Sequence, residues 1–161
     1  MKRWIPVLGV ACVLGLQATA LGQGQPDFSG AWTFSQAKSG EGLSGNSPDV
    51  QFPTQIVVKQ SADELFVETS SVRQGTLAAT FTLDGSTVTV EAPPGMTAAG
   101  TAMLEGTMVV VSTRRSYPSP AGEISVEFKE TWSLAGNELS VEKTRTQAGD
   151  SETAIAVYDK R

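Results

Sequence analysis

Hydrophobic and polar residues alternate along three similar stretches of this chain, residues 83–90, 104–111 and 134–141. Each stretch begins with leucine, passes through a short turn that contains glycine, and ends in a second alternating run. Alternation with a period of two is typical of a strand with one buried face, and a glycine turn between two such runs is typical of a β-hairpin. The pattern therefore predicts three hairpins.

Weaker alternation surrounds these stretches. Residues 28–34 predict a first strand, residues 55–69 a looser hairpin, and residues 153–158 a last strand. No segment after residue 22 has the period of an amphipathic helix. The predicted fold class is all-β, an antiparallel up-and-down meander of about ten strands.

The hairpin at residues 55–69 has a less obvious register than the other three. Pairing Val58 with Leu65 places Ile56 opposite Val67. This register keeps one face of the hairpin apolar, as a half-buried sheet requires.

Ten sequential strands predict a closed barrel, with a two-layer sandwich as the alternative. Closure removes exposed strand edges, and a meander suits a barrel better than Greek-key crossovers do. A bacterial outer-membrane barrel would need an apolar outer band. The outward positions are instead mostly polar: Thr82, Thr87, Thr89, Glu91, Ser125, Glu127, Lys129, Thr131, Ser133, Ser140 and Glu142.

Up-and-down order places alternate connections at opposite ends of the barrel. The connections predicted at one end are short: residues 60–64, 84–85, 105–106 and 135–138. Those at the other end are longer and richer in Gly, Pro or Ser: residues 35–53, 70–78, 92–100, 116–122 and 146–152. We therefore expect a closed end and a mouth, with residues 35–53 forming a long flexible loop at the mouth.

The pattern of the first 22 residues predicts a signal peptide that is cleaved on export. A basic start is followed by an apolar run from Trp4 to Leu16 and by small residues at 18–22. The run is shorter than the ~20 residues of a membrane-spanning helix. Lipid attachment at Cys12 is a minor alternative, because Gly9 stands where a lipoprotein signal would have leucine. The prediction is an exported protein, periplasmic or extracellular, with one domain at residues 23–161 and no transmembrane span.

Composition excludes several kinds of chemistry. Cys12 is the only cysteine, and it leaves with the signal; the chain has no histidine. Disulfides, Cys or His zinc sites, haem ligation by His, and Ser-His or Cys-His nucleophiles are therefore excluded. Loss of Lys2 and Arg3 leaves ten basic against 17 acidic residues, a net charge of −7. We expect no metal, no cofactor and no nucleic-acid partner.

A short motif near the start of the mature chain resembles a known group. Gly30-x-Trp32 in the first strand, a long loop after it and a β-meander resemble the calycin superfamily, the lipocalins and fatty-acid-binding proteins. In lipocalins this tryptophan plugs the closed end beneath a basic side chain from near the C-terminus. The resemblance implies a lipocalin-like barrel in which Lys160 or Arg161 covers Trp32.

Both ends of the mature chain also resemble a fatty-acid-binding protein, at residues 28–32 and 157–160. Two features depart from that group. The loop at residues 35–53 does not read as the helical portal, and an Arg-x-Tyr carboxylate clamp would need arginine where Ala156 stands.

Strand parity predicts which side chains face the interior. Matching Leu134 with Leu139 places Trp132 opposite Val141, on the inner face. By the same register Glu130 lies opposite Lys143 and Phe128 opposite Arg145. Extending the inner row of Val109 and Val111 adds Thr113, Arg115 and Tyr117.

These residues allow two interpretations. Arg115 and Arg145 near the mouth, with Lys143 and Glu130 deeper, would suit an anionic head group on an apolar body, contacted by Tyr117, Phe128 and Thr113. Alternatively, Glu130 and Lys143 form a structural ion pair and the arginines are solvated. Trp32 and Trp132 are expected to be structural plugs.

Three functions remain open on the sequence. The first is a lipocalin-like domain that binds a small hydrophobic or amphipathic molecule, with an anionic ligand as one form of this function. The second is a structural or interaction module with a filled core and no ligand. The third is an enzyme with acid-base chemistry at Glu130 beside Lys143.

Overall fold

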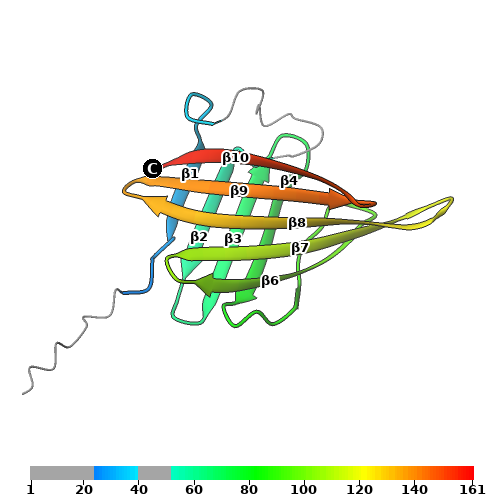
Figure 1. Cartoon of the computed structure of the whole chain (residues 1–161), viewed down its shortest axis with the longest axis horizontal. Helices are drawn as coiled ribbons and strands as arrows, with labels where there is room; N and C mark the ends of the chain where they lie inside the picture. Colours follow the sequence, from blue (N-terminus) through cyan, green and yellow to red (C-terminus); the bar gives the residue numbers. More distant parts are fainter. Residues whose placement is uncertain (1–23, 40–51) are drawn as a thin grey trace, which may run out of the picture.

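Ten antiparallel strands form one sheet in the computed structural model, which describes residues 24–39 and 52–161 (Figure 1). The strands are β1 (Gly30–Phe34), β2 (Gln55–Gln60), β3 (Glu64–Ser71), β4 (Gly75–Thr82), β5 (Val88–Thr89), β6 (Thr97–Glu105), β7 (Met108–Ser119), β8 (Gly122–Ala135), β9 (Glu138–Gln147) and β10 (Asp150–Lys160). The sheet order is β4-β3-β2-β1-β10-β9-β8-β7-β6-β5, and no helix occurs in these two ranges. The predicted all-β meander is confirmed.

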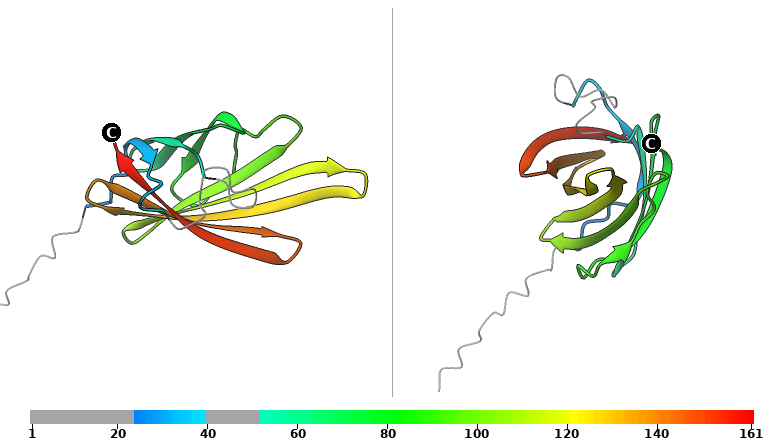
Figure 2. Two further views of the ribbon diagram at one scale, coloured as in Figure 1. Left: turned by 90° about the horizontal axis from the view of Figure 1, so that it is seen from above. Right: turned by 90° about the vertical axis from the view of Figure 1, so that its right-hand side faces the viewer.

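The sheet curls until its two edge strands approach each other, which makes a nearly closed barrel (Figure 2). β1 pairs with β10, and Trp32 lies opposite Lys160. β4 and β5 are the ends of the sheet order, and β4 contacts β5 and β6 without a ladder of backbone hydrogen bonds. A barrel forms rather than the alternative sandwich.

Two of the three repeated stretches form the predicted hairpins, and the one at residues 134–141 has the predicted register. Leu134 pairs with Leu139, and Leu104 pairs with Val109. Their turns contain Gly136 and Gly106, with φ of 62° and 63°. Glycine adopts this left-handed conformation without a steric penalty, so the turns fix the register of the strands that follow.

The first repeated stretch, residues 83–90, does not form the predicted hairpin. The Asp84 carboxylate accepts a hydrogen bond from the Ser86 amide at 2.9 Å, and the Gly85 amide donates to the Ala102 carbonyl at 3.0 Å. The first bond lies within the turn and the second joins the turn to β6, and β5 pairs with β6 instead of with β4. The sequence pattern missed this because it does not show which neighbour a turn will contact.

The register predicted for residues 55–69 is also wrong, by two residues. Val58 pairs with Val67, and Leu65 pairs with Gln60. The turn is tighter than expected, since the Ser61 amide donates to the Glu64 carbonyl at 2.9 Å. A shift of two residues preserves the face of each side chain, so Val58 and Val67 are still buried.

The connections predicted to be long are mostly tight turns. β7 and β8 remain paired as far as Ser119 opposite Gly122, and β9 and β10 as far as Gln147 opposite Asp150. Figure 1 shows the β7 and β8 ribbon extending well beyond its neighbours. The prediction of long loops was wrong because strand pairing continues through polar residues that lie in water.

Aromatic rings fill the end of the barrel where β1 begins. Phe28, Trp32 and Trp132 are at most 2% exposed, and the Phe28 ring lies 6.4 Å from that of Trp132. The indole nitrogen of Trp32 donates to the Phe28 carbonyl at 3.0 Å. The Gln60 side chain accepts from the Phe28 amide at 2.9 Å. Trp32 and Trp132, the predicted plugs, thus lie buried beside a third ring.

Lys160 covers this end, as the calycin resemblance implies. Its Nζ atom lies 5.2 Å from the centre of the Trp32 ring, within the range of a cation–π contact. Arg161, the alternative, instead donates its backbone amide to the Ala31 carbonyl at 2.9 Å.

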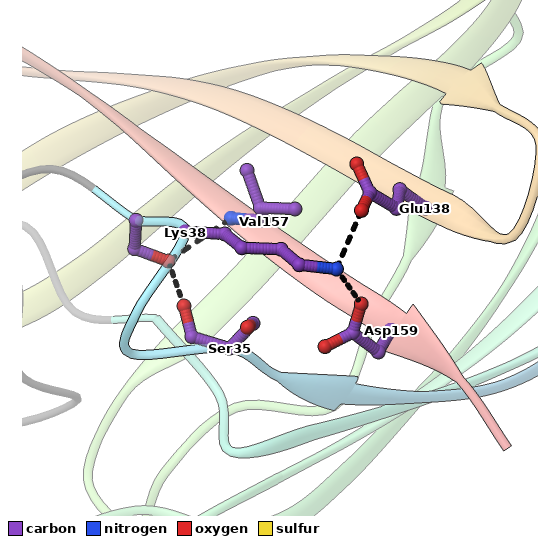
Figure 3. A network of polar contacts seen from close by, with 6 residues as sticks. Ser35, Lys38, Glu138, Val157 and Asp159 are labelled. Atoms are coloured by element: carbon purple, nitrogen blue, oxygen red, sulfur yellow. Dashed lines mark hydrogen bonds and ion pairs between the residues drawn. The ribbon is translucent and has the colours of Figure 1, made fainter.

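The segment after β1 is tied to the last two strands (Figure 3). Lys38 Nζ lies 2.5 Å from Glu138 and 2.6 Å from Asp159. The Val157 amide donates to the Ser39 hydroxyl at 3.1 Å. The three charged side chains are 43–49% exposed, so the ion pairs fix the path of the chain more than they stabilise it.

Two predicted features lie outside the described residues. They are the signal peptide, residues 1–22, and most of the loop at residues 35–53. Within the described ranges, no helix is long and apolar enough to cross a membrane.

The approach of Lys160 to Gly30 gives a test of this end of the barrel. Gly30 has φ of 150°, and a Cβ atom there would lie 2.7 Å from Lys160 Cε. Gly30→Ala should therefore lower the free energy of unfolding by about 1–3 kcal/mol in urea denaturation. Gly24→Ala is the control, because nothing lies within 4 Å of a Cβ there. Equal losses in both variants would contradict this account.

Candidate functional site

The register of β8 and β9 places a carboxylate opposite an ammonium group inside the barrel. Glu130 pairs with Lys143, as the sequence predicts. Lys143 Nζ lies 2.9 Å from Glu130 Oε1, and the Trp132 indole donates to Glu130 Oε2 at 2.9 Å. The Lys143 and Glu130 side chains are 10% and 22% exposed. Because both carboxylate oxygens have a partner, the buried charge is compensated.

The surroundings of Glu130 keep it ionised. Burial raises the pKa of this carboxyl, but the positive charge and hydrogen bond of Lys143, the hydrogen bond from Trp132 and the charge of Arg115 outweigh that effect. The resulting pKa lies below the ordinary value of 4.5. Glu130 is therefore a carboxylate at neutral pH, unsuited to donate a proton as a general acid.

Phe128 lies close to two cations. The guanidinium of Arg115 is 5.2 Å from the centre of its ring, and Lys143 Nζ is 5.1 Å from it. Lys143 also lies 5.7 Å from the centre of the Phe52 ring. Aromatic faces attract cations, so these rings help to hold positive charge in the interior.

Arg115 is the second interior cation, and its hydrogen bonding is incomplete. One terminal nitrogen donates to Gln74 Oε1 at 3.2 Å, while the buried Nε atom has no hydrogen-bond partner. Burial lowers the pKa of Arg115, and the charge of Glu130 opposes that shift. Arginine still remains charged in proteins. A buried donor without a partner is uncommon and costs about 1–3 kcal/mol.

These groups line an inner cavity of about 70 Å³. It contains two cations, Arg115 and Lys143, and one carboxylate, Glu130. The other lining residues include Phe52, Pro53, Ile56, Thr69, Ser71, Gln74, Leu77, Val141 and Tyr158. The arrangement offers a compact anion cationic donors within a lining of mixed polar and apolar side chains.

The remaining predicted ligand contacts are not at the inner cavity. Thr113 lines a neighbouring cavity together with Arg115. Arg145 donates to Gln147 on the same strand, and Tyr117 pairs with Ile124 on the extended ribbon. Neither Arg145 nor Tyr117 lines the inner cavity. Their role as ligand contacts remains a prediction.

Sequence reasoning missed most of the residues that line the inner cavity. Phe52 and Pro53 fell in the predicted loop, and Gln74 fell in a predicted connection. Tyr158, which is fully buried, donates its hydroxyl to the Pro53 carbonyl at 3.1 Å, and burial together with the charge of Glu130 raises its pKa. Parity along the last predicted strand could have placed Tyr158 inside.

A larger hollow of about 610 Å³ lies on the outer face of β6–β9. Its lining is rich in small hydroxyl side chains: Thr87, Thr101, Ser112, Thr144 and Thr146. Its charged residues are exposed, and Arg114 lies 3.7 Å from Glu127. Because this hollow lacks a buried donor or acceptor without a partner, the interior is the stronger candidate site.

Solved structures share this architecture. The zebrafish ileal bile acid-binding protein, solved with cholic acid, is 16% identical, with a TM-score of 0.57, over 83% of this chain and 98% of that one. A fatty acid transporter, REP1-NXSQ, is 12% identical, with a TM-score of 0.57, over 83% and 95%. A secretory abundant heat soluble protein from Ramazzottius varieornatus is 13% identical, with a TM-score of 0.60, over 84% and 96%.

The chain therefore shares the β-barrel fold of these bile acid-binding, fatty acid transport and heat soluble proteins. At these identities the likeness shows the fold alone. No family model matches the sequence, and no curated protein matches it.

The ion pair in the interior can be tested by stability. Glu130→Gln leaves the Lys143 ammonium buried without its carboxylate, so the free energy of unfolding should fall by about 3 kcal/mol at pH 7. Glu127→Gln, on the same strand but 61% exposed, should change it by about 0.5 kcal/mol or less. Urea denaturation measures both variants, and similar small losses would show that the interior pair contributes little.

The Glu130→Gln variant also tests how the stability contributed by Glu130 depends on pH. Because folding lowers the pKa of Glu130, its contribution to stability is present above pH 4.5 and is lost as the pH falls through its lower folded-state pKa. The stability difference between wild type and Glu130→Gln should therefore shrink below pH 4.5. A difference that stays constant down to pH 2 would contradict the lowered pKa.

Proposed function

We propose that this chain is an exported, non-enzymatic binding protein that holds a small amphipathic anion, with the acidic head at Arg115 and the apolar body inside the barrel. The observation that carries the proposal is the buried Arg115 Nε, which has no partner within a cavity that holds two cations and one carboxylate. The basic, apolar and small residues at 1–22 support export.

The chemistry of the cavity favours an anion over a neutral ligand. Lys143 already pairs with Glu130, whereas Arg115 bonds to the neutral amide of Gln74. A carboxylate can accept two parallel hydrogen bonds from a guanidinium, and such charge-assisted bonds are stronger than neutral ones. The bile acid-binding and fatty acid transport proteins with the same fold support a ligand of this class.

The limited interior space favours a second candidate, a structural or interaction module without a ligand. The inner cavity of about 70 Å³ is small beside the 300–1,000 Å³ typical of ligand pockets. This candidate predicts that the barrel binds no amphipathic anion under any condition, so the experiment below distinguishes the two functions.

Calorimetric titration with dodecanoate tests the proposed function. Wild type should bind one equivalent, and Arg115→Met should weaken the affinity about tenfold or more, because it removes a charge-assisted hydrogen bond. Arg114→Met is the matched control, since its side chain is 64% exposed and points away from the barrel. Absence of binding to wild type, or equal weakening by both variants, would contradict the proposal.

Export can be tested by determining where the secreted protein begins. Expression of the full chain in a bacterial host should give a mature protein that starts immediately after residue 20 or residue 22, as measured by mass spectrometry of the exported fraction. An intact chain that begins at Met1 and is retained with cytoplasmic proteins would contradict export.

A further inference from the structure

The last strand of the barrel has a long unpaired edge. On one side β10 pairs with β9 from Asp150 to Asp159. On the other side it pairs with β1 only at residues 158–160. Among the residues that the structure describes, residues 150–156 have no strand on that second side, and Figure 1 shows β10 at the border of the long strands β6–β10. We call residues 150–156 the β10 edge.

The backbone groups of three residues point out from the β10 edge. In antiparallel strands, residues alternate between pairs that exchange hydrogen bonds and pairs that do not, so successive residues bond to opposite sides. The Val157 carbonyl accepts from the Ser35 amide at 2.8 Å, and the Val157 amide donates to the Ser39 hydroxyl. Val157 therefore bonds away from β9. By the same alternation, three residues of the β10 edge point the same way: Ser151, Thr153 and Ile155.

The β10 edge lacks the features that usually keep a strand from pairing with another chain. Natural edge strands carry proline, lysine or a β-bulge. The β10 edge contains neither proline nor lysine, and its pairing with β9 is uninterrupted. The β7 and β8 ribbon, which also extends beyond its neighbours, carries Pro118 and Pro120. The β10 edge is therefore suited to accept a further strand.

A second copy of the chain can pair with the β10 edge in few registers. Two antiparallel edges must place their outward-pointing residues opposite each other, so the possible registers differ by steps of two residues. In the central register, Thr153 lies opposite Thr153 of the second copy, and Ser151 lies opposite Ile155. Facing threonines stabilise strand pairs, and this pair continues a row of hydroxyls, because Thr153 Oγ1 lies 2.8 Å from Thr144 Oγ1.

The neighbouring registers meet obstacles. A register centred on Glu152 would place two carboxylates directly opposite each other, which destabilises strand pairing. A register centred on Ala154 would place Val157 opposite Ser151, although the backbone groups of Val157 already have partners in the segment after β1. The register centred on Thr153 avoids both, because Glu152 then faces Ala154.

We propose that the β10 edge is a homodimer interface, in which two copies of the chain add their last strands to each other, antiparallel and centred on Thr153. The two barrels then share one continuous sheet across a two-fold axis. A two-fold contact is closed, so association stops at two copies. Only three residues of each copy join the new ladder, so we expect a reversible dimer.

Sedimentation equilibrium of the full chain tests the interface. Wild type should pass reversibly from monomer to dimer as its concentration rises. Thr153→Lys places two ammonium groups opposite each other at the axis and should weaken dimerisation about tenfold or more. Thr101→Lys is the matched control, because Thr101 lies in the same cross-strand row but on β6, four strands away. It should change dimerisation by about twofold or less.

A complementary variant tests whether residue 153 faces its own copy. Thr153→Glu alone should also weaken dimerisation, because it places two carboxylates at the axis. A mixture of Thr153→Lys and Thr153→Glu should recover dimers that contain one copy of each, because opposite charges then face each other. Recovery also shows that both variants fold.

Disulfide trapping tests the register. In a full-length Cys12→Ser background, Thr153→Cys should form an intermolecular disulfide on air oxidation, because the Cα atoms of such an opposite pair lie about 5.5 Å apart. Ser151→Cys should not, because the two copies of residue 151 would lie about 14 Å apart along the strands. Non-reducing electrophoresis measures both variants.

The outcomes are decisive without any ligand. A wild type that sediments as a monomer at every concentration would overturn the interface, as would association that is equally strong in Thr153→Lys and Thr101→Lys. Equal trapping by Ser151→Cys and Thr153→Cys would overturn the register on which the proposal depends. The dodecanoate titration tests the proposed function separately, because the residues that form the new ladder do not line the inner cavity.

Discussion

The ion pair between Glu130 and Lys143 is the interaction on which the rest of the interior depends. Without Glu130, two cations would share a space that is largely removed from water, which is energetically costly. With it, one positive charge is compensated and the charge on Arg115 is left to attract an anion. The Trp132 indole, which donates to the same carboxylate, links this pair to the aromatic residues that close the barrel.

How far the sequence predicts this arrangement depends on what sets each register. A glycine turn fixes Leu134 against Leu139, and strand parity then carries the pairing to Glu130 and Lys143. The same reasoning failed at residues 83–90, where Asp84 and Gly85 make contacts with residues close in sequence and with β6. It also missed Phe52 and Gln74, because positions in loops and turns have no periodicity from which to infer their direction.

A barrel with this fold need not be a container, and its interior here is mostly filled by its own side chains. Arg115 nevertheless has a buried donor without a partner, an arrangement that proteins usually avoid unless it serves a function. The proposed ligand reconciles the two observations. Its acidic head requires little space, which the inner cavity of about 70 Å³ supplies beside Arg115.

The most direct measurement is the NMR signal of the Arg115 Nε–H group during titration with dodecanoate. Binding of a carboxylate at this atom should move the proton resonance downfield and slow its exchange with water, while the signal of the exposed Arg114 remains in place. A titration in which dodecanoate binds but the Arg115 signal moves no more than that of Arg114 would contradict the central claim that this guanidinium receives the acidic head.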